Sequence, residues 1–232
     1  DCERFYLDEA YATHAALWGE DRRKRYGRDS RRQFCRAAVT GNPAYDDRRL
    51  PEVVTSNPGY WLWVTRPHHT NKCYAPSRSP LEGRAILAAL LDGLKAHPGQ
   101  RLVIKTHPYD NMSVYHDLLS QHTAADAVEL TNAPPLTLFE EAMFFGKPVI
   151  HAHFCPTPPT MPFVEYGAAL SGWDAPMLRT ALERAAKLTA EERAAMLAGQ
   201  QAFLLDFAGP CDGHAGQRVR NFVAGIVEGT LF

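Results

Sequence analysis

The feature that most constrains the fold is a regular alternation of short apolar segments and longer helical segments between residues 60 and 151. The apolar segments are rich in aromatic and β-branched residues, which favour strands. The longer segments repeat apolar residues at helical spacing. This alternation predicts an α/β fold in which right-handed βαβ units surround a parallel sheet. The predicted strands are 60–65, 102–105, 127–130 and 148–151, and the predicted helices are 79–97, 111–122 and 136–145.

The ends of the predicted elements carry suitable residues. Gly146 follows the helix at 136–145, and glycine accepts the left-handed conformation that closes a helix. Pro148 lacks an N–H group and therefore suits the entrance of a strand. Thr189 and Glu192 have the spacing of a capping box. A short strand is expected at 167–170, and a helical C-terminus is predicted with helices at about 174–187, 189–206 and 213–228.

The composition excludes several classes of protein. The chain has 232 residues, of which 45% are hydrophobic and 22% charged, as in an ordinary globular protein. Its five cysteines are an odd number without a CxxC pair, which favours reduced thiols over a disulfide framework or a structural zinc site. The sequence contains no run of about 18 apolar residues, so no transmembrane helix is predicted. The charged first residues are unlike a signal peptide, so we expect a cytoplasmic location.

A basic stretch at residues 21–36 contains eight lysine and arginine residues, offset by Asp21 and Asp29. A solvated surface is the default interpretation of such a stretch. Contact with an anionic glycan, a lipid headgroup or a nucleic acid is the sharper alternative, which the net charge of −1 for the whole chain weakens. We predict no nucleic-acid partner, and we place any peripheral contact with the inner membrane face in this stretch.

Two predicted strands end in segments that contain histidine. RPHHT follows the first strand at residues 66–70, and THP follows the second at residues 106–108. The carboxyl ends of parallel strands meet at one edge of a sheet, so these side chains are expected to share a cleft. Histidine donates to phosphate oxygens and acts as acid or base near neutral pH. Either segment alone favours a simple strand cap, but two matching exits, followed by Glu141 and Gly146, favour a site.

Other chemistries have weaker signals. His151, His153 and Cys155 lie close together, but no CxxC or HxxxH spacing is present, so a metal is the minority interpretation and none is predicted. The glycine-rich phosphate loops and the GxSxG elbow of hydrolases are absent. Phosphate donors would therefore come from helix N-termini, isolated glycines and side chains. Asp212 is expected to cap a helix whose first N–H groups point outward, with an ordinary N-cap as its alternative role.

Five segments together resemble the donor-binding half of GT-B glycosyltransferases. They are VTGNPAYD at 39–46, WVTRPHH at 63–69, LVIKTHP at 102–108, EAMFFGKPVI at 141–150 and PCDGHAGQRVRNFV at 210–223. The likeness is strongest to capsule-type and CDP-glycerol or sialyl/Kdo transferase-like enzymes, and more distant to UDP-N-acetylglucosamine 2-epimerases. It implies a Rossmann-like nucleotide-sugar-binding domain at 59–232. Residues 1–58 would be an N-terminal segment and a linker to the acceptor side.

The resemblance also implies roles for individual residues. The His-Pro motif of the family lies at the nucleotide phosphates and matches His107-Pro108. The helix carboxylate before the Gly-Lys-Pro turn contacts the ribose hydroxyls and matches Glu141. A carboxylate accepts two hydroxyl hydrogen bonds well, and histidine can neutralise a leaving phosphate. The catalytic residues implied are His107 and His68, and the substrate-binding residues are His69, Thr70, Lys105, Pro108, Glu141, Gly146, Asp212 and Gly213.

The chain departs from this family pattern in two places. Judged by its length, the sequence is expected to lack the acceptor-binding N-terminal domain of the family. A further strand with a small-residue turn, which normally precedes the Glu-Ala helix and donates to phosphate, is missing as well, because LTLFEEAMFFGKPVI at 136–150 runs straight through.

Three functions remain open from the sequence. The leading prediction is the transfer of a glycosyl or glycerophosphate group in bacterial cell-surface polysaccharide synthesis, with this chain as the donor-binding half. The partners would be a nucleotide-sugar donor and a glycan or lipid-linked acceptor, with no cofactor. The alternatives are an epimerase or hydrolase of sugar nucleotides, and a non-catalytic nucleotide-binding module.

Overall fold

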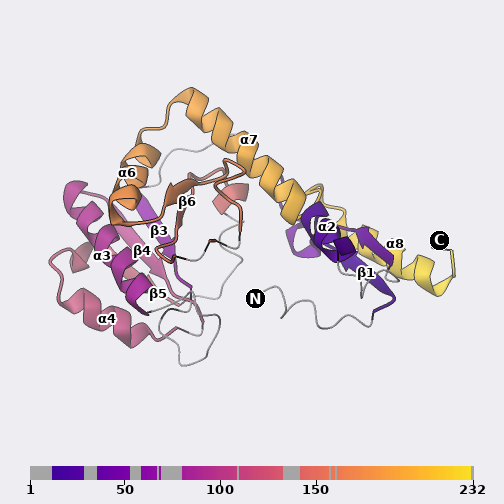
Figure 1. The fold of residues 1–232 in the computed structure, drawn as a ribbon, viewed down its shortest axis with the longest axis horizontal. Coiled ribbons are helices and arrows are strands. Elements are labelled where there is room, and N and C mark those ends of the chain that lie inside the picture. The colour runs from indigo at the N-terminus through magenta and orange to yellow at the C-terminus, as the bar shows by residue number, and fades with distance from the viewer. Residues whose placement is uncertain are drawn as a thin grey trace.

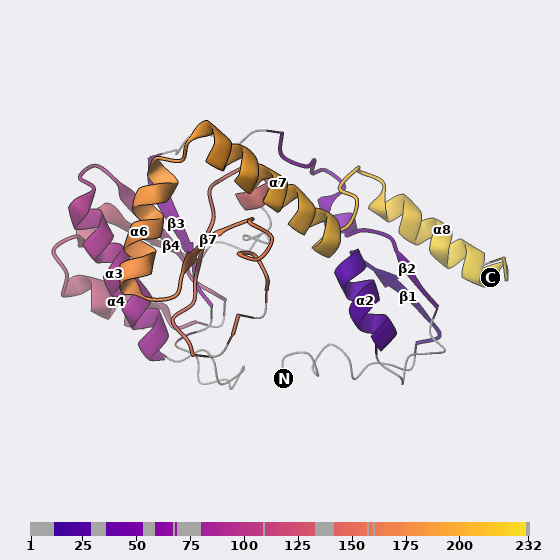
Figure 2. The ribbon, with the colours of Figure 1, turned by 45° about the horizontal axis from the view of Figure 1, so that its top comes forward.

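The structure is a computed structural model that describes residues 12–28, 36–52, 59–66, 68, 80–108, 110–132, 142–156, 158–159 and 161–230. These residues form two lobes of unequal size, joined by the long helix α7 (Ala190–Phe207) (Figure 1). The large lobe holds strands β3 to β7 with helices α3, α4 and α6. The small lobe holds β1, α2, β2 and α8. Turning the molecule by 45° keeps the lobes apart, with α7 between them (Figure 2).

The large lobe contains a three-stranded parallel sheet in the order β3-β4-β5. Strand β3 (Tyr60–Val64) pairs with β4 (Arg101–Lys105) in full register, from Tyr60 opposite Arg101 to Val64 opposite Lys105. The next strand, β5 (Val128–Thr131), pairs with the last four residues of β4. Leu102 and Ile104 of the central strand share one face of the sheet and are fully buried, whereas Val103 between them is half-buried.

Two further strands of the large lobe form a separate parallel pair. Strand β6 (Ile150–Ala152) pairs with β7 (Leu170–Gly172). Among the described residues, β6 has no ladder to β3, so the sheet expected from the sequence is divided into sheets of three and two strands.

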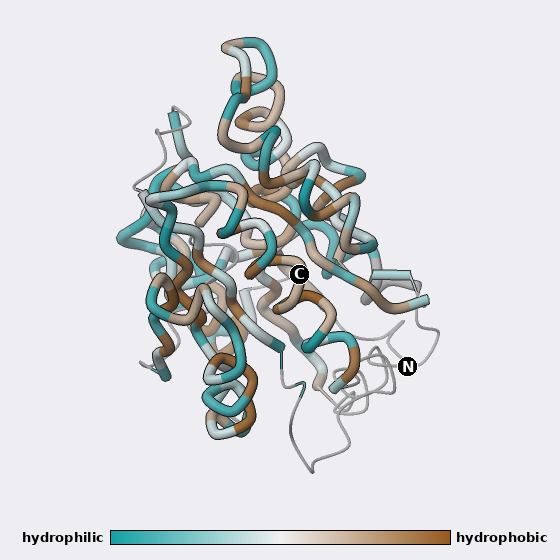
Figure 3. Tube along the Cα trace, turned by 90° about the vertical axis from the view of Figure 1, so that its left-hand side faces the viewer, coloured by the Kyte–Doolittle hydropathy of each residue, from teal (hydrophilic) through white to brown (hydrophobic). Residues whose placement is uncertain are grey.

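The helices of the large lobe cover the strands and have their expected amphipathic character. Helix α3 (Pro80–Ala96) packs against α6 (Ala175–Ala186), while α4 (Met112–Ser120) lies beside them (Figures 1 and 2). Helical turns carry both hydrophobic and hydrophilic residues, since each helix buries one face only (Figure 3). Asn111 caps α4, and Thr189 with Glu192 forms the predicted capping box at the start of α7.

The small lobe is built from both ends of the described chain. Its parallel pair is β1 (His14–Leu17) with β2 (Arg36–Val39), and the helix between them is α2 (Glu20–Arg28). A 3-10 turn, η2 (Pro43–Tyr45), follows β2 and contacts α8 (Ala215–Val227), while α2 contacts α7.

Two apolar cores stabilise the lobes. The first fills the space between β3, β4 and the helices α3 and α6, around residues such as Leu87, Leu102 and Ile104. The second surrounds α7, where Phe203 is fully buried beside residues from β6's entrance and from η2. Burial of one large apolar side chain contributes about 1.5–3 kcal/mol. The second core therefore joins the small lobe to the large one.

The predicted fold class is confirmed: the chain is α/β, with parallel strands flanked by helices and a helical C-terminus. One boundary was wrong, since β7 begins at Leu170 rather than 167. The reason is a turn in which Gly167 has φ 69° and donates to the carbonyl of Val164 at 2.9 Å. Most of the helix predicted at 136–145 lies outside the described residues. The boundary between residues 58 and 59 stays a prediction. No helix in the described ranges has the length and hydropathy needed to cross a bilayer.

Candidate functional site

A cavity of about 410 Å³ lies in the large lobe between strands β3 and β6. All five residues of β3 line it in succession, and so do residues 147–153 around β6. Side chains of a strand alternate between the two faces of a sheet. A cavity on one face would therefore touch every second residue, so this cavity runs along the strand edges. It occupies the position where the sheet is divided.

The cavity is apolar along its length and polar at one end. Helices α3 and α6 supply aliphatic residues, among them Ile86, Leu90, Leu178 and Leu182. Arg66 and His68 follow β3, while His151 and His153 belong to β6 and its exit. These four residues mark the carboxyl ends of both strands, which is where ligands bind in open α/β sheets.

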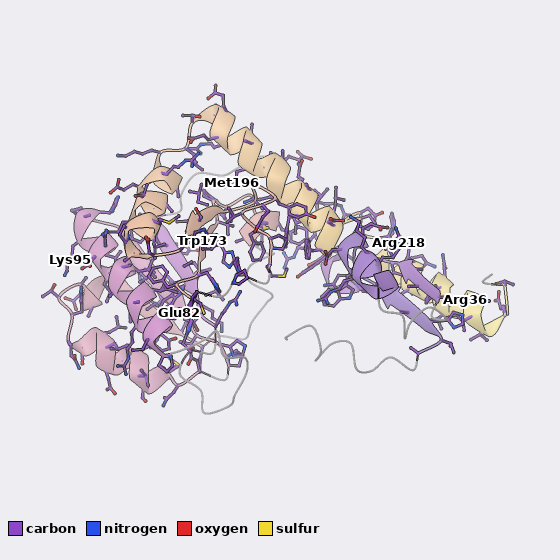
Figure 4. All side chains as sticks on the ribbon, in the orientation of Figure 1. Arg36, Glu82, Lys95, Trp173, Met196 and Arg218 are labelled. Atoms are coloured by element: carbon purple, nitrogen blue, oxygen red, sulfur yellow. The ribbon has the colours of Figure 1, made fainter. Side chains whose placement is uncertain are left out.

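The carboxylate of Glu82 lies at this polar end and joins the two strand exits. Glu82 sits in the first turn of α3 and is 8% exposed (Figure 4). Its Oε1 accepts a hydrogen bond of 3.0 Å from the backbone N–H of Phe154 and lies 3.9 Å from Nδ1 of His153. Its Oε2 lies 3.9 Å from Nδ1 of His68. A negative charge is favourable in the first turn of a helix because the macrodipole is positive there.

His151 differs from its neighbours because it is packed among aromatic rings. The ring is 2% exposed and meets Phe163 and Trp173 edge-on, at centroid distances of 5.1 and 5.3 Å. Burial lowers the pKa of His151 to about 4, with smaller contributions from the positive charges of Arg66 and His153. His151 is therefore neutral at pH 7 and serves as part of the wall.

The exits of β3 and β4 are tied together by Thr65. Its N–H donates to the carbonyl of Lys105 at 2.9 Å, and its hydroxyl accepts the N–H of His107 at 2.9 Å. The same hydroxyl donates to Asp110, which also accepts the phenol of Tyr115 at 2.7 Å. Burial and the Asp110 carboxylate raise the pKa of Tyr115, so the phenol stays protonated.

The histidine-containing exits do meet at one edge of the sheet, as the sequence predicted. His68 lines the cavity, and the backbone N–H of His107 donates to Thr65 directly after β3. His107 is half-buried and Pro108 exposed, and neither lines the cavity. Lys105 is buried and donates to the carbonyl of Thr106 at 2.6 Å, and burial lowers its pKa. The roles predicted for these residues stay predictions. His69, Thr70 and Glu141 lie outside the described residues.

Gly146 closes a helical turn, as predicted. Its φ is 57°, in the left-handed region. Its N–H donates to Met143 at 2.8 Å and that of Lys147 to Ala142 at 2.9 Å, the pair of bonds that defines a Schellman motif. The conformation explains the glycine without a ligand, and its predicted contact with substrate stays a prediction.

The expectation that Asp212 caps the last helix was wrong. The N-cap of α8 is His214, and Asp46 accepts the first free N–H groups, from Ala215 at 2.7 Å and Gly216 at 2.8 Å. These donors therefore face a carboxylate of the chain itself rather than pointing outward.

Asp212 is engaged elsewhere in the small lobe. Its carboxylate pairs with Arg218 at 2.9 Å and accepts the N–H of His214 at 3.0 Å. The hydrogen bond from Arg218 is the main cause that lowers the pKa of Asp212 to about 2. Gly213 has φ 82°, and a Cβ there would stand 2.9 Å from the guanidinium of Arg49. Arg218 marks this region well apart from Glu82, so the structure does not bring Asp212 and Gly213 to the cavity (Figure 4).

Sequence reasoning missed Arg66, Glu82 and His153 as members of this polar end. The spacing of Ser79 and Glu82 in the sequence fits a capping box, which favours a structural role for Glu82, and Ser79 lies outside the described residues. His153 had been weighed only as a metal ligand, and within the described part of the chain no group of three histidine, cysteine or acidic residues could hold a metal. The signal that could have found His153 is that β6, like β3 and β4, is followed by a histidine within four residues.

Comparisons with known proteins support the fold. No protein-family profile matches the sequence, and no curated protein is significantly similar to it. Among solved structures, MnaA of S. aureus with UDP matches at a TM-score of 0.51 and 17% identity, covering 83% of this chain and 55% of that one. A putative UDP-N-acetylglucosamine 2-epimerase from Listeria monocytogenes matches at a TM-score of 0.48 and 16% identity, covering 84% and 54%.

These matches have a definite scope. At 17% identity the likeness to MnaA shows a shared fold, and the chain spans about half the length of the solved structures it matches. The part of the sequence prediction that concerned an epimerase-like fold is therefore supported. Function has to be argued from the site.

Proposed function

We propose that this chain is the nucleotide-binding half of an enzyme that acts on a sugar nucleotide. The observation that carries the proposal is the convergence of Arg66, His68, Glu82 and His153 at the carboxyl ends of β3 and β6. A cationic guanidinium and imidazole rings suit a diphosphate, and the apolar length of the cavity suits a base or sugar. The structurally similar MnaA was solved with UDP, which supports the same ligand class here.

Two chemical outcomes share this binding mode. A glycosyltransferase and an epimerase both benefit from groups that neutralise a diphosphate as its bond to the sugar breaks. Transfer to an acceptor in cell-surface polysaccharide synthesis was the leading prediction from the sequence. Epimerisation is the second candidate, and the likeness to MnaA, which was solved with UDP, fits either reaction. Products distinguish them: transfer needs an acceptor, whereas epimerisation converts the sugar nucleotide alone.

Ligand binding is the first test. A thermal-shift screen with UDP, CDP and CMP should raise the unfolding temperature with at least one nucleotide, because a ligand at 100 times its Kd stabilises the native state by about 2.7 kcal/mol. Uridine and cytidine are the matched controls without phosphate. The absence of any shift, confirmed by calorimetric titration, would contradict both enzymatic proposals for this chain.

A variant tests the predicted His-Pro contact. His107→Ala should weaken nucleotide binding by about 1–3 kcal/mol if its ring donates to a phosphate. His116→Ala is the matched control, because His116 is exposed on α4 of the same lobe. Equal nucleotide affinity for both variants, with intact circular dichroism, would remove His107 from the site.

A further inference from the structure

The carboxylate of Glu82 lies near two histidine rings that line the cavity. Each carboxylate oxygen lies 3.9 Å from one Nδ1 atom, that of His68 on one side and that of His153 on the other. A carboxylate facing Nδ1 selects the form of the ring in which Nδ1 carries a proton. An imidazole that presents Nδ1 to a carboxylate keeps Nε2 as a second nitrogen that can meet a ligand.

Packing holds these rings in place. His68 lies against Gly83, where a Cβ would approach the ring to 2.9 Å, so only glycine leaves this space. His153 meets Trp173 edge-on at a centroid distance of 6.2 Å. His68 and His153 are 4% and 6% exposed, respectively, and both line the cavity. Rings packed in this way keep a fixed orientation on the cavity wall, which lowers the cost of reorganisation when a ligand binds.

The charged groups around the pair favour an anion. Arg66 follows β3, and Lys147 precedes β6 on the cavity wall. His151 contributes no charge at pH 7, because its pKa lies near 4. Glu82 is the acidic residue on the cavity wall, and its carboxylate is directed at the rings and at the N–H of Phe154. A phosphate group would meet cationic and N–H-bearing groups rather than the carboxylate.

We propose that Glu82 is a positioning residue that sets His68 and His153 as a paired phosphate-binding site for the diphosphate of the nucleotide. This inference rests on the proposed function. It supplies donors to a chain whose sequence has no glycine-rich phosphate loop. Both Nε2 atoms donate to the phosphate only when the rings carry protons on both nitrogens, so nucleotide binding takes up protons from solution.

The first measurement uses the unaltered protein. Calorimetric titration with UDP in two buffers of different ionisation enthalpy should show net proton uptake. The Kd should rise at least threefold between pH 7.0 and pH 8.5, a range in which a phosphate with a second pKa near 6 is already ionised. Uridine is the control ligand, and its affinity should not change with pH. Absence of proton uptake, with UDP bound, would overturn the paired site.

The second measurement uses Glu82→Gln, with Asp92→Asn as the matched control on the exposed face of α3. Glu82→Gln should weaken UDP binding about tenfold and leave uridine binding unchanged, whereas Asp92→Asn should change neither. The ¹⁵N chemical shifts of His68 and His153 should also change in Glu82→Gln, since a merely structural carboxylate would not set their proton positions. Unchanged UDP affinity and unchanged shifts would refute the positioning role.

Failure of this inference and failure of the proposed function give different results. If UDP binds without proton uptake and without dependence on Glu82, the proposed nucleotide-binding function is supported and the paired phosphate site is refuted. If no nucleotide binds, inorganic pyrophosphate tests the pair directly. Pyrophosphate binding should weaken with rising pH. If pyrophosphate does not bind either, both the paired site and the proposed function are refuted. If Glu82→Gln does not fold, proton uptake and the histidine shifts of the unaltered protein decide.

Discussion

Asp46 in the small lobe and Glu82 in the large lobe are carboxylates with similar positions and different surroundings. Each lies at the N-terminus of a helix and joins segments far apart in the sequence. Asp46 receives two backbone N–H groups of α8 at 2.7 and 2.8 Å. Glu82 receives one backbone N–H and faces two imidazole rings at 3.9 Å. The first arrangement is a purely structural contact, which we call the clasp: Asp46 holding the N-terminus of α8. The second leaves titratable histidines beside a cavity.

The same contrast extends to the backbone around each carboxylate. The junction between the end of α7 and the small lobe is packed main chain against main chain, since a Cβ at Gly209 would meet the carbonyl of Trp18 at 2.2 Å. The end of the cavity near Glu82 is lined by side chains instead. Backbone contacts hold a shape, whereas side chains around a cavity can meet a ligand. Helix N-termini in one chain therefore serve two purposes, and the surroundings of the carboxylate tell them apart.

The largest expected change in the free energy of unfolding concerns the close backbone contact between the end of α7 and the small lobe. Gly209 has φ 89°, so Gly209→Ala should cost about 1–2 kcal/mol for the left-handed conformation and about 1–3 kcal/mol more for the clash. Gly99→Ala is the matched control, since Gly99 has φ 88° and a Cβ added there would meet nothing within 4 Å. Urea unfolding should therefore show a clearly larger loss at Gly209. Equal losses in the free energy of unfolding would mean that the backbone around Gly209 shifts to make room for the added Cβ.

The next effect concerns the clasp itself. Asp46→Ala should lower the free energy of unfolding by about 3 kcal/mol, because two hydrogen bonds to a charged group are lost. Asp47→Ala removes the neighbouring carboxylate, which is exposed and 3.6 Å from Arg48, and should stay within about 0.5 kcal/mol. Chemical denaturation at pH 7 compares the two. A small change in the free energy of unfolding for Asp46→Ala would show that Asp46 is not a structural contact, and the contrast with Glu82 would then fail.

The smallest effect concerns the buried ring in the cavity wall. The folded-state pKa of His151, about 4, lies below the ordinary value of 6.5. The unfolded chain therefore binds a proton that the native state resists, and stability falls as the pH drops from about 6.5 towards 4. His151→Leu should reduce the loss of stability between pH 7 and pH 5 by about 1–2 kcal/mol. An identical pH profile in the variant would show that the ring is protonated in the folded protein.

The fold could be predicted largely from local signals. Strands such as 60–65 and helices such as 174–187 carry their own periodicity and caps, so their type and order followed from the sequence. The division of the sheet depends on which strands become neighbours, a non-local property that periodicity does not contain. The start of β7 was misplaced because the left-handed conformation of Gly167 extends a turn that reads as apolar strand.

The site could be predicted in outline only. Histidines at strand exits pointed to the correct edge, because parallel strands share the direction of their carboxyl ends. Glu82 was assigned to a cap, since sequence spacing describes contacts within a helix and not those across to Phe154, 72 residues away. Asp212 was misread for the same reason, because the residue that reaches α8 is Asp46, 169 residues upstream of Ala215.

Helix α7 has a consequence for how the protein comes apart. Phe203 is fully buried, stacks on Phe207 at a centroid distance of 4.3 Å, and shares its core with Tyr45 from the N-terminal side and Phe163 from the large lobe. Any opening that releases this helix exposes apolar surface in both lobes at once. The two lobes, although separate in outline, therefore belong to one cooperative unfolding unit.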